Sequence, residues 1–438
     1  MLRALLVLCM TGFIGAASAQ NDSAMLDGVL TAANGAPATN ALVVIFSASP
    51  RDGRPGTRSA LHYPDCGKHT RTDAQGHFVL KPVDKELLFR LLISAPGHAP
   101  DYIRDADPQF GGLALKLKAR RGARDASPPS VFGKLLAPDG NPVIGARVTA
   151  DMARAGTTTY SSLNAASVDP FTVTDEEGLF RLACTNRYPE FNVIVDAPHL
   201  AKRRMWLDVG KAHLIRLRSG VAVSGRVQRD GNPMPHLLLT LSTERRAMEF
   251  TLRGLEVATD AQGRFTLAHV PADSRFLLHT KMNDTTGLGA ALLAAPVNTG
   301  PDGSTLQLDE LALTPTATLR GRVLLADGQP APRRTSITLQ VERTTDSVNA
   351  ILDPDGWFEF MGVPKDTVVL RLRIPGYRLS AKNPNKDWLN EDQIVGQLTQ
   401  NHDELFIDLE RAQGPVQRNR TPGATRSDRN KPLQGAKL

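Results

Sequence analysis

Short runs in which apolar and polar residues alternate recur along the whole chain of 438 residues. Clear examples are residues 113–117, 213–217 and 405–409, each bounded by turn-forming residues. Alternation with a period of two predicts β-strands with one buried face, and no stretch sustains the 3.6-residue period of a helix. The pattern therefore predicts an all-β protein made of antiparallel sheets.

One phrase occurs four times: an Asp, a Gly three residues later and an aromatic Phe two residues beyond the Gly. The Asp side chain can accept hydrogen bonds from backbone N–H groups ahead of it and so start a turn. The Gly supplies the positive φ that a short hairpin loop requires. We predict four hairpins with these turn residues: Asp73 and Gly76, Asp175 and Gly178, Asp260 and Gly263, Asp353 and Gly356.

A second phrase precedes each hairpin: Asn-Gly or Asp-Gly followed by Pro, starting at residues 34, 139, 230 and 327. The strand before it carries a Gly (Gly28, Gly133, Gly225 and Gly321), which gives successive spacings of 105, 92 and 96 residues. Seven short strands in under a hundred residues is the size of a Greek-key sandwich. We predict four tandem seven-stranded β-sandwiches, over residues 20–118, 131–219, 220–315 and 316–410.

These phrases, in the order strand-Gly, Asp-Gly-x-Pro, Thr-Asp-x-x-Gly-x-Phe and then Pro-Gly-Tyr at Pro375, resemble the carboxypeptidase regulatory-like domain. The resemblance implies a transthyretin-like sandwich among the carbohydrate-binding-like folds. Residues 63–68 of the first copy (Tyr-Pro-Asp-Cys-Gly-Lys) are similar to a subtype found in large exported bacterial proteins. The matching residues are turn and core positions, so they specify the fold and not an activity.

The two ends of the chain differ from the repeats. Residues 1–19 have Arg3, an apolar run and the small residues Ala17-Ser18-Ala19, which predicts a signal peptide and export to the periplasm, the cell surface or the exterior. No later run is long enough to predict a membrane span. Residues 119–130 are predicted to be a basic linker, and residues 411–438 a disordered basic tail.

The tail explains most of the positive charge. It holds seven basic residues and one acidic residue, which accounts for +6 of the net charge of +7. Charge concentrated in a tail argues against a nucleic-acid partner. We expect a solvated tail, with attraction to an acidic surface as the alternative.

Two cysteines, Cys66 and Cys184, follow the predicted signal peptide and lie in different repeats. Export permits a disulfide between them, which would fix the first two sandwiches as an elbow. The alternative is two buried cysteines that never meet. The sequence leaves both interpretations open.

Two segments contain residue types that bind metals, and neither predicts a metal site. His62, Asp65 and His69 lie around Cys66 and are zinc-ligand types, but a polar loop is the favoured interpretation. Asn383, Asn385 and Asp387 alternate as in a calcium loop, yet Trp388 stands where an EF-hand needs Gly. No metal and no cofactor are predicted.

Sugar binding needs exposed aromatic platforms, and the candidates are Trp206 and Trp388, with packing at a sheet edge or under a loop as the alternative. Trp357 lies in the fourth predicted hairpin, beside the core residue Phe358, and is therefore not counted as a platform. Motifs of metalloproteases, serine hydrolases, nucleotide-binding loops and dithiol redox sites are missing from the sequence.

The leading hypothesis is a non-catalytic exported rod that presents sandwich surfaces to a protein or glycan partner in the envelope. The alternatives are a carbohydrate-binding module protein and an accessory subunit of an exported hydrolase or metal-dependent enzyme.

Overall fold

The computed structural model describes residues 24–51, 63–119, 129–160, 171–184, 188–243, 255–380, 382–390 and 393–412. The predicted signal peptide, most of the predicted linker and nearly all of the predicted tail lie outside these residues. The regular structure of the described part is nine sheets, one single-turn α-helix and one short 3-10 helix, so the all-β prediction is confirmed. No helix within the described residues is long and apolar enough to cross a membrane.

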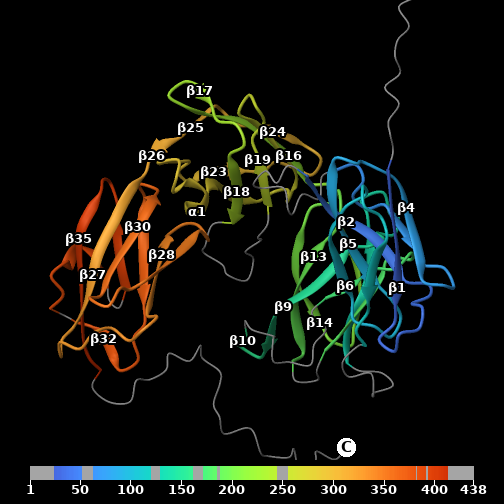
Figure 1. Ribbon diagram of the computed structural model, residues 1–438, viewed down its shortest axis with the longest axis horizontal. Coiled ribbons are helices and arrows are strands. Elements are labelled where there is room, and N and C mark those ends of the chain that lie inside the picture. The colour runs from blue at the N-terminus through green and yellow to red at the C-terminus, as the bar shows by residue number, and fades with distance from the viewer. Residues whose placement is uncertain are drawn as a thin grey trace, which may run out of the picture.

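Eight of the sheets form four pairs that follow one another along the chain (Figure 1). In the first pair, a sheet of order β4-β1-β7 faces one of order β3-β2-β5-β6. Its strands are β1 Ala24–Thr31, β2 Leu42–Pro50, β3 His69–Arg71, β4 His77–Val83, β5 Leu87–Ser94, β6 Asp101–Ala106 and β7 Leu113–Lys116. We call this pair the first sandwich.

The second sandwich repeats the arrangement. A sheet of order β12-β8-β15 faces one of order β10-β9-β13-β14, in which β11 also pairs with β9. The strands are β8 Ser130–Leu136, β9 Arg147–Ala155, β10 Thr158–Tyr160, β11 Thr172–Val173, β12 Leu179–Ala183, β13 Glu190–Asp196, β14 Arg203–Asp208 and β15 Ala212–Arg216.

In the third sandwich the last strand is split, because β24 and β25 both pair with β16 beside β17 and β20. The facing sheet has the order β19-β18-β21-β23, and α1 lies where the other copies have a turn. The elements are β16 Val221–Arg229, β17 Asn232–Pro233, β18 Leu238–Thr243, β19 Leu255–Ala258, β20 Arg264–Val270, β21 Arg275–Thr280, α1 Met282–Thr285, β22 Ala290–Ala291, β23 Ala295–Asn298, β24 Thr305–Gln307, β25 Leu311–Ala312 and β26 Thr314–Pro315.

The fourth sandwich pairs a sheet of order β30-β27-β35-β32 with one of order β29-β28-β31-β34-β33. Its elements are β27 Ala317–Leu325, β28 Ser336–Val341, β29 Ser347–Ile351, β30 Trp357–Val363, β31 Thr367–Leu372, β32 Tyr377–Leu379, η3 Lys386–Trp388, β33 Leu389–Asn390, β34 Gln393–Gln397 and β35 His402–Arg411. The domain boundaries given by the sequence analysis stay predictions.

The prediction of purely antiparallel sheets is wrong at one place in every copy. The last strand of each repeat pairs in parallel with the first, as β15 does with β8 and β35 with β27. The glycine of the first strand makes this possible. A Cβ on Gly133 would lie 2.1 Å from the carbonyl oxygen of His213, and one on Gly321 would lie 2.2 Å from that of Leu405.

Each sandwich has its own apolar core, and a fifth buried cluster joins the first sandwich to the second. Residues along β2 are buried from Leu42 to Ala48, so both faces of this strand are covered. Its outward side chains pack against the segment around β11. We call this the elbow cluster: Leu42, Val44, Phe46, Leu92 and Val173, with Tyr102, Ile144 and Phe171 packed against it.

Polar contacts reinforce the elbow. Arg71 forms an ion pair of 2.7 Å with Glu176, and Arg147 donates to the hydroxyl oxygen of Tyr102 at 3.0 Å. The turn at His199 contacts both neighbouring sandwiches. His199 Nε2 lies 2.8 Å from the carbonyl oxygen of Cys66, and its ring meets that of His269 edge-on at 6.0 Å.

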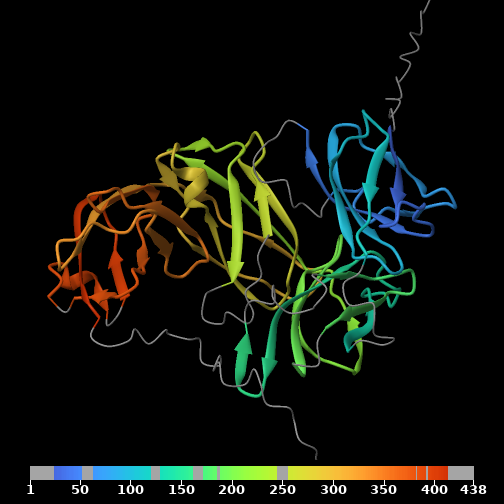
Figure 2. The ribbon, with the colours of Figure 1, turned by 60° about the horizontal axis from the view of Figure 1, so that its bottom comes forward.

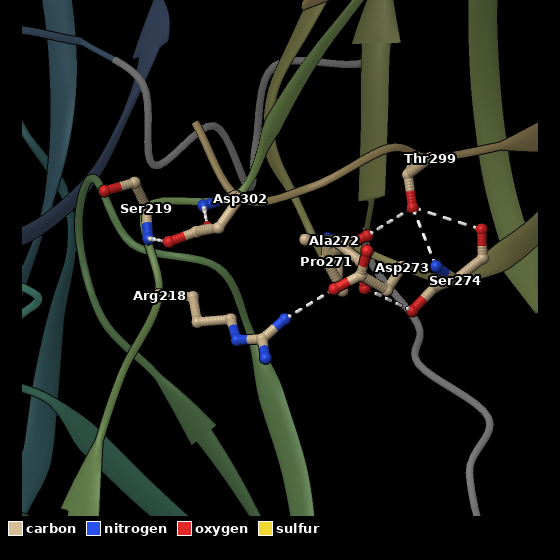
Figure 3. A network of polar contacts seen from close by, with 9 residues as sticks. Arg218, Ser219, Pro271, Ala272, Asp273, Ser274, Thr299 and Asp302 are labelled. Carbon is tan, nitrogen blue, oxygen red and sulfur yellow. Dashed lines mark hydrogen bonds and ion pairs between the residues drawn. The ribbon is translucent and has the colours of Figure 1, made fainter. Parts of the chain in front are cut away.

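The connection to the third sandwich is a compact polar network (Figure 3). Arg218 pairs with Asp273 at 2.9 Å, and the carboxylate of Asp302 accepts from the backbone N–H groups of Ser219 and Gly220. Figures 1 and 2 show the four sandwiches along an arch, with the first two side by side and the third between them and the fourth. The sequence hypothesis of a rod left the angles between the sandwiches open, and the structure places the four sandwiches along an arch.

Candidate functional site

A groove of about 890 Å³ lies between the first and second sandwiches. Its floor is the outer face of the sheet β12-β8-β15, and its opposite wall includes residues 94–98 of the first sandwich. The elbow cluster sets the distance between these two sides. We call this hollow the interdomain groove.

A row of three side chains crosses the floor of the groove, with a lysine in the middle and one leucine on each side. Leu179 and Leu214 both lie opposite Lys134 in the strand register, on the face that points away from the core. Their exposed fractions are 47% and 73%, whereas large aliphatic side chains are mostly buried in folded proteins. Exposed leucines in a concave surface indicate an interaction site.

The neighbouring row carries an aromatic ring beneath a cation. Phe132 lies opposite Arg181 and Ala212. The Arg181 guanidinium carbon is 4.8 Å from the centre of the Phe132 ring, and its Nη1 donates to the Ser130 hydroxyl at 2.5 Å. One face of the ring is thus covered, and Arg181 is held at the rim with part of its charge available.

The charged side chains in the groove are mostly cationic. Among the described residues that line it, Arg71, Lys134 and Arg181 are basic, and Asp175 is the one carboxylate. Arg71 is paired with Glu176, so within the described part of the chain the lining cations without such a pair are Lys134 and Arg181. Asp175 is already engaged, because its Oδ1 accepts from the backbone N–H groups of Glu177 and Leu179. The groove therefore favours a ligand that combines apolar groups with negative charge.

The hairpin residues of the sequence analysis form the same turn in all four copies. Asp73 Oδ1 accepts from the N–H groups of Gln75 and His77 at 2.9 and 2.8 Å, and Gly76 has φ of 79°. These bonds hold the pKa of the Asp73 carboxyl below its usual value. The other copies repeat the turn at Asp175 with Gly178, Asp260 with Gly263, and Asp353 with Gly356.

The threonine before the Asp also has a structural role, which the sequence analysis missed. Thr174 is fully buried, and its hydroxyl donates to the carbonyl oxygen of Val143 and accepts from the N–H of Ala146. Thr72 and Thr259 make the equivalent bonds. The recurrence of Thr at this position was the available signal, and the fourth copy replaces it with Leu352.

The two cysteines are not joined in the structure, which contradicts the disulfide interpretation. Cys66 lies in the core of the first sandwich and Cys184 in the core of the second. Burial raises the pKa of the Cys66 thiol to about 12. The elbow that the disulfide would have fixed is formed by apolar packing instead.

Neither group of potential metal ligands converges. Within the described residues, no three His, Cys, Asp or Glu side chains are placed to hold a metal. Asp65 pairs with Lys68 at 2.5 Å, His69 is exposed, and His62 lies outside the described residues. In the other segment, Asn383 is buried and accepts from the N–H of Asn385, while the Asp387 side chain is exposed.

The structure changes the assignment of the tryptophans. The prediction of Trp388 as a ligand platform is wrong, because Trp388 is buried in the fourth core against Gly396. Its ring is tilted against that of His402, with the ring centres 5.3 Å apart. Trp206 lies half-buried on the edge strand β14, with the Arg154 guanidinium 4.4 Å from its ring centre. That cation covers one face of the Trp206 ring.

Trp357 lies in the hairpin beside the core residue Phe358, as the sequence analysis placed it, but its own side chain is outside the core. It lies half-buried on the outer face of the fourth sandwich, opposite Arg322, which is flanked on its other side by Phe406. This row is equivalent by register to Leu179, Lys134 and Leu214. Counting outward from the paired glycines Gly133 and Gly321 could have revealed both rows in the sequence.

The chain matches no protein-family model, and no curated protein matches it. Several solved structures are similar at low level. A streptococcal ancillary pilin is 10% identical with a TM-score of 0.24 and covers 65% of this chain and 100% of its own. The Bacillus anthracis TIE protein is 11% identical with a TM-score of 0.19, covering 86% and 69%. The Bacillus cereus major pilin subunit BcpA is 9% identical with a TM-score of 0.18, covering 89% and 99%.

TM-scores this low support no conclusion about what the chain does. The surfaces of the chain itself indicate what it binds.

Proposed function

We propose that this chain is a non-catalytic exported protein of the carboxypeptidase regulatory-like type that binds an acidic, partly apolar segment of another protein in the interdomain groove. The observation that carries the proposal is the row of Leu179, Lys134 and Leu214, exposed on the floor of a groove between two sandwiches.

The shape and chemistry of the groove favour an extended peptide over a glycan. Glycan binding relies on uncovered aromatic rings. Among the described aromatic residues that line the groove, Phe132 is covered on one face by Arg181 and Phe180 is buried. Leucine side chains instead match the apolar side chains of a peptide, and Lys134 and Arg181 match acidic ones. A protein partner is therefore preferred to the carbohydrate-binding alternative.

Binding of labelled synthetic peptides to the mature chain tests the proposal. One peptide alternates Leu and Glu, a second alternates Leu and Lys, and an oligogalacturonate represents an anionic glycan. We expect fluorescence anisotropy to show binding of the Leu/Glu peptide, weakened by salt because exposed charges are screened. The Leu179→Asp/Leu214→Asp double variant should weaken it by at least about tenfold, or about 1.4 kcal/mol.

Ile351→Asp is the matched control, because Ile351 is 67% exposed on β29 of the fourth sandwich. It should leave the dissociation constant unchanged. Equal losses in the control and the groove variant, or equal binding of both peptides, would refute the groove as the site. Binding of the oligogalacturonate alone would replace the protein partner by a glycan.

A further inference from the structure

A second, smaller pocket of about 100 Å³ lies on the outer face of the first sandwich, beyond the elbow cluster. It is lined by β2, β5 and β6, and its polar side chains are Ser47, Ser49, Arg90, Arg104 and Asp105. A volume of this size has room for about three water molecules, or for one tetrahedral oxyanion. The pocket is separate from the interdomain groove.

Two strand irregularities meet at this pocket. The register of β2 against β5 shifts between Ile45 and Ser47, which brings Ser47 opposite Arg90. The register of β5 against β6 shifts between Phe89 and Leu91, so Arg90 faces two residues, Arg104 and Asp105. Bulges re-aim side chains and are common beside functional sites.

The backbone is also unusual here. Asp105 has φ of 52°, in the left-handed region that non-glycine residues seldom adopt. The two bulges and this residue together direct two arginines and a buried serine, Ser47 with 3% exposure, to one pocket.

The two arginines give the pocket a net positive charge, because Asp105 is the one carboxylate among its described lining residues. Among the described residues, neither Arg90 nor Arg104 forms an ion pair, and the one aromatic contact of Arg90 is with the Tyr102 ring at 5.8 Å. Arginine in such a setting binds oxyanions through several parallel N–H groups, and serine hydroxyls add further donors. Asp105 at the rim opposes a fully negative occupant.

We propose that this pocket binds a tetrahedral oxyanion group, a phosphate or a sulfate, through Arg90, Arg104 and the hydroxyl of Ser47. The group is either a free ion or an ester on a larger molecule, and the two sources share the same recognition chemistry. The first sandwich thus has an anion site in addition to its share of the groove.

Isothermal titration of the mature chain tests this proposal. The probes are inorganic phosphate, inorganic sulfate, glucose 6-phosphate and glucose 6-sulfate. We expect saturable binding of at least one probe, with an ester binding at least as tightly as the free ion if the natural ligand is an ester. Arg90→Gln and Arg104→Gln should each weaken binding by about tenfold.

Two further variants sharpen the test. Arg264→Gln removes an equal charge from exposed Arg264 on β20 and should leave binding unchanged. Asp105→Asn removes the opposing carboxylate and keeps a residue that tolerates the left-handed region, so it should tighten binding several-fold. An equal loss in Arg264→Gln, weaker binding by a folded Asp105→Asn variant, or no saturable binding of any probe would overturn the proposal.

Discussion

Single residues in this chain are constrained chiefly by close backbone approach. Gly263 and Gly231 both have positive φ, of 72° and 80°. A Cβ on Gly263 would lie 2.5 Å from the carbonyl oxygen of Val227, whereas Gly231 has no comparable neighbour. The two positions therefore separate backbone strain from steric clash.

Alanine at the two positions should have unequal effects. An alanine at position 231 would be strained only by its left-handed backbone conformation. We therefore expect Gly231→Ala to lower the free energy of unfolding by roughly 1–2 kcal/mol. Gly263→Ala adds the clash, and we expect a larger loss from the third sandwich. Denaturant unfolding of both variants checks this, and equal losses would show that the clash is relieved at no cost.

The cysteines give a second test at this scale. Because both thiols are buried in separate cores and burial raises the pKa of Cys66, we expect neither to react with iodoacetamide at pH 8 until the protein unfolds. Reductant should leave the melting temperature unchanged. Mass spectrometry that finds a peptide pair linked through Cys66 and Cys184 in the exported protein would contradict the structure.

Local sequence predicted the turns well and the surfaces poorly. The Asp and Gly of each hairpin follow from local backbone chemistry, so they could be assigned from the sequence. The places of Trp357 and Trp388 depend on which face of a strand is covered and on how an insertion folds back. Those are tertiary effects that the position of one residue in a repeat does not reveal.

At the scale of elements, a search for alternating apolar and polar residues does not find strands that are covered on both faces, and β2 is such a strand. Its continuous apolar run was a signal for a strand covered on both faces, and the second cover is a neighbouring sandwich. The parallel pairing of the last strand with the first was likewise invisible to a period-of-two pattern. The interdomain groove depends on both features, which is why the sequence analysis did not find it.

The junction between the third and fourth sandwiches should depend on pH. Asp346 is buried there and accepts from the N–H of Met282 at 2.9 Å. Burial raises the pKa of Asp346 to about 6, and the charge of Asp284 adds to this, while Lys281 opposes it. Lys281 itself is paired with Glu256.

The direction of the pH dependence of stability follows from the raised pKa of Asp346. Between about pH 4 and pH 6 the folded junction binds more protons than the unfolded chain, so its stability falls as the pH rises through this window. Asp346→Asn keeps an acceptor without the charge and should stabilise the junction at pH 7.5 by roughly 1–3 kcal/mol. Melting curves at pH 5 and 7.5 test this, with exposed Asp309→Asn as the control; an unchanged pH dependence in Asp346→Asn would refute the assignment.

At the scale of the whole molecule, the elbow makes the first two sandwiches one mechanical unit. Tandem sandwiches that each have a separate core would unfold independently, but the elbow cluster buries side chains from both of the first two sandwiches. We expect calorimetry of the mature chain to show these two sandwiches unfolding together. Val173→Asp places a charge in the cluster and should split that transition, whereas Ile351→Asp should not. Two separate transitions in the unaltered chain would contradict a rigid elbow.

The central claim is that the interdomain groove holds its ligand between two sandwiches. Hydrogen–deuterium exchange with and without the Leu/Glu peptide tests this most directly, because one experiment measures the protection of backbone amides on both walls of the groove. We expect slower exchange at residues 94–98 of the first sandwich and in β12 and β15 of the second, with the fourth sandwich unchanged. Protection on one side alone, or protection confined to the fourth sandwich, would contradict it.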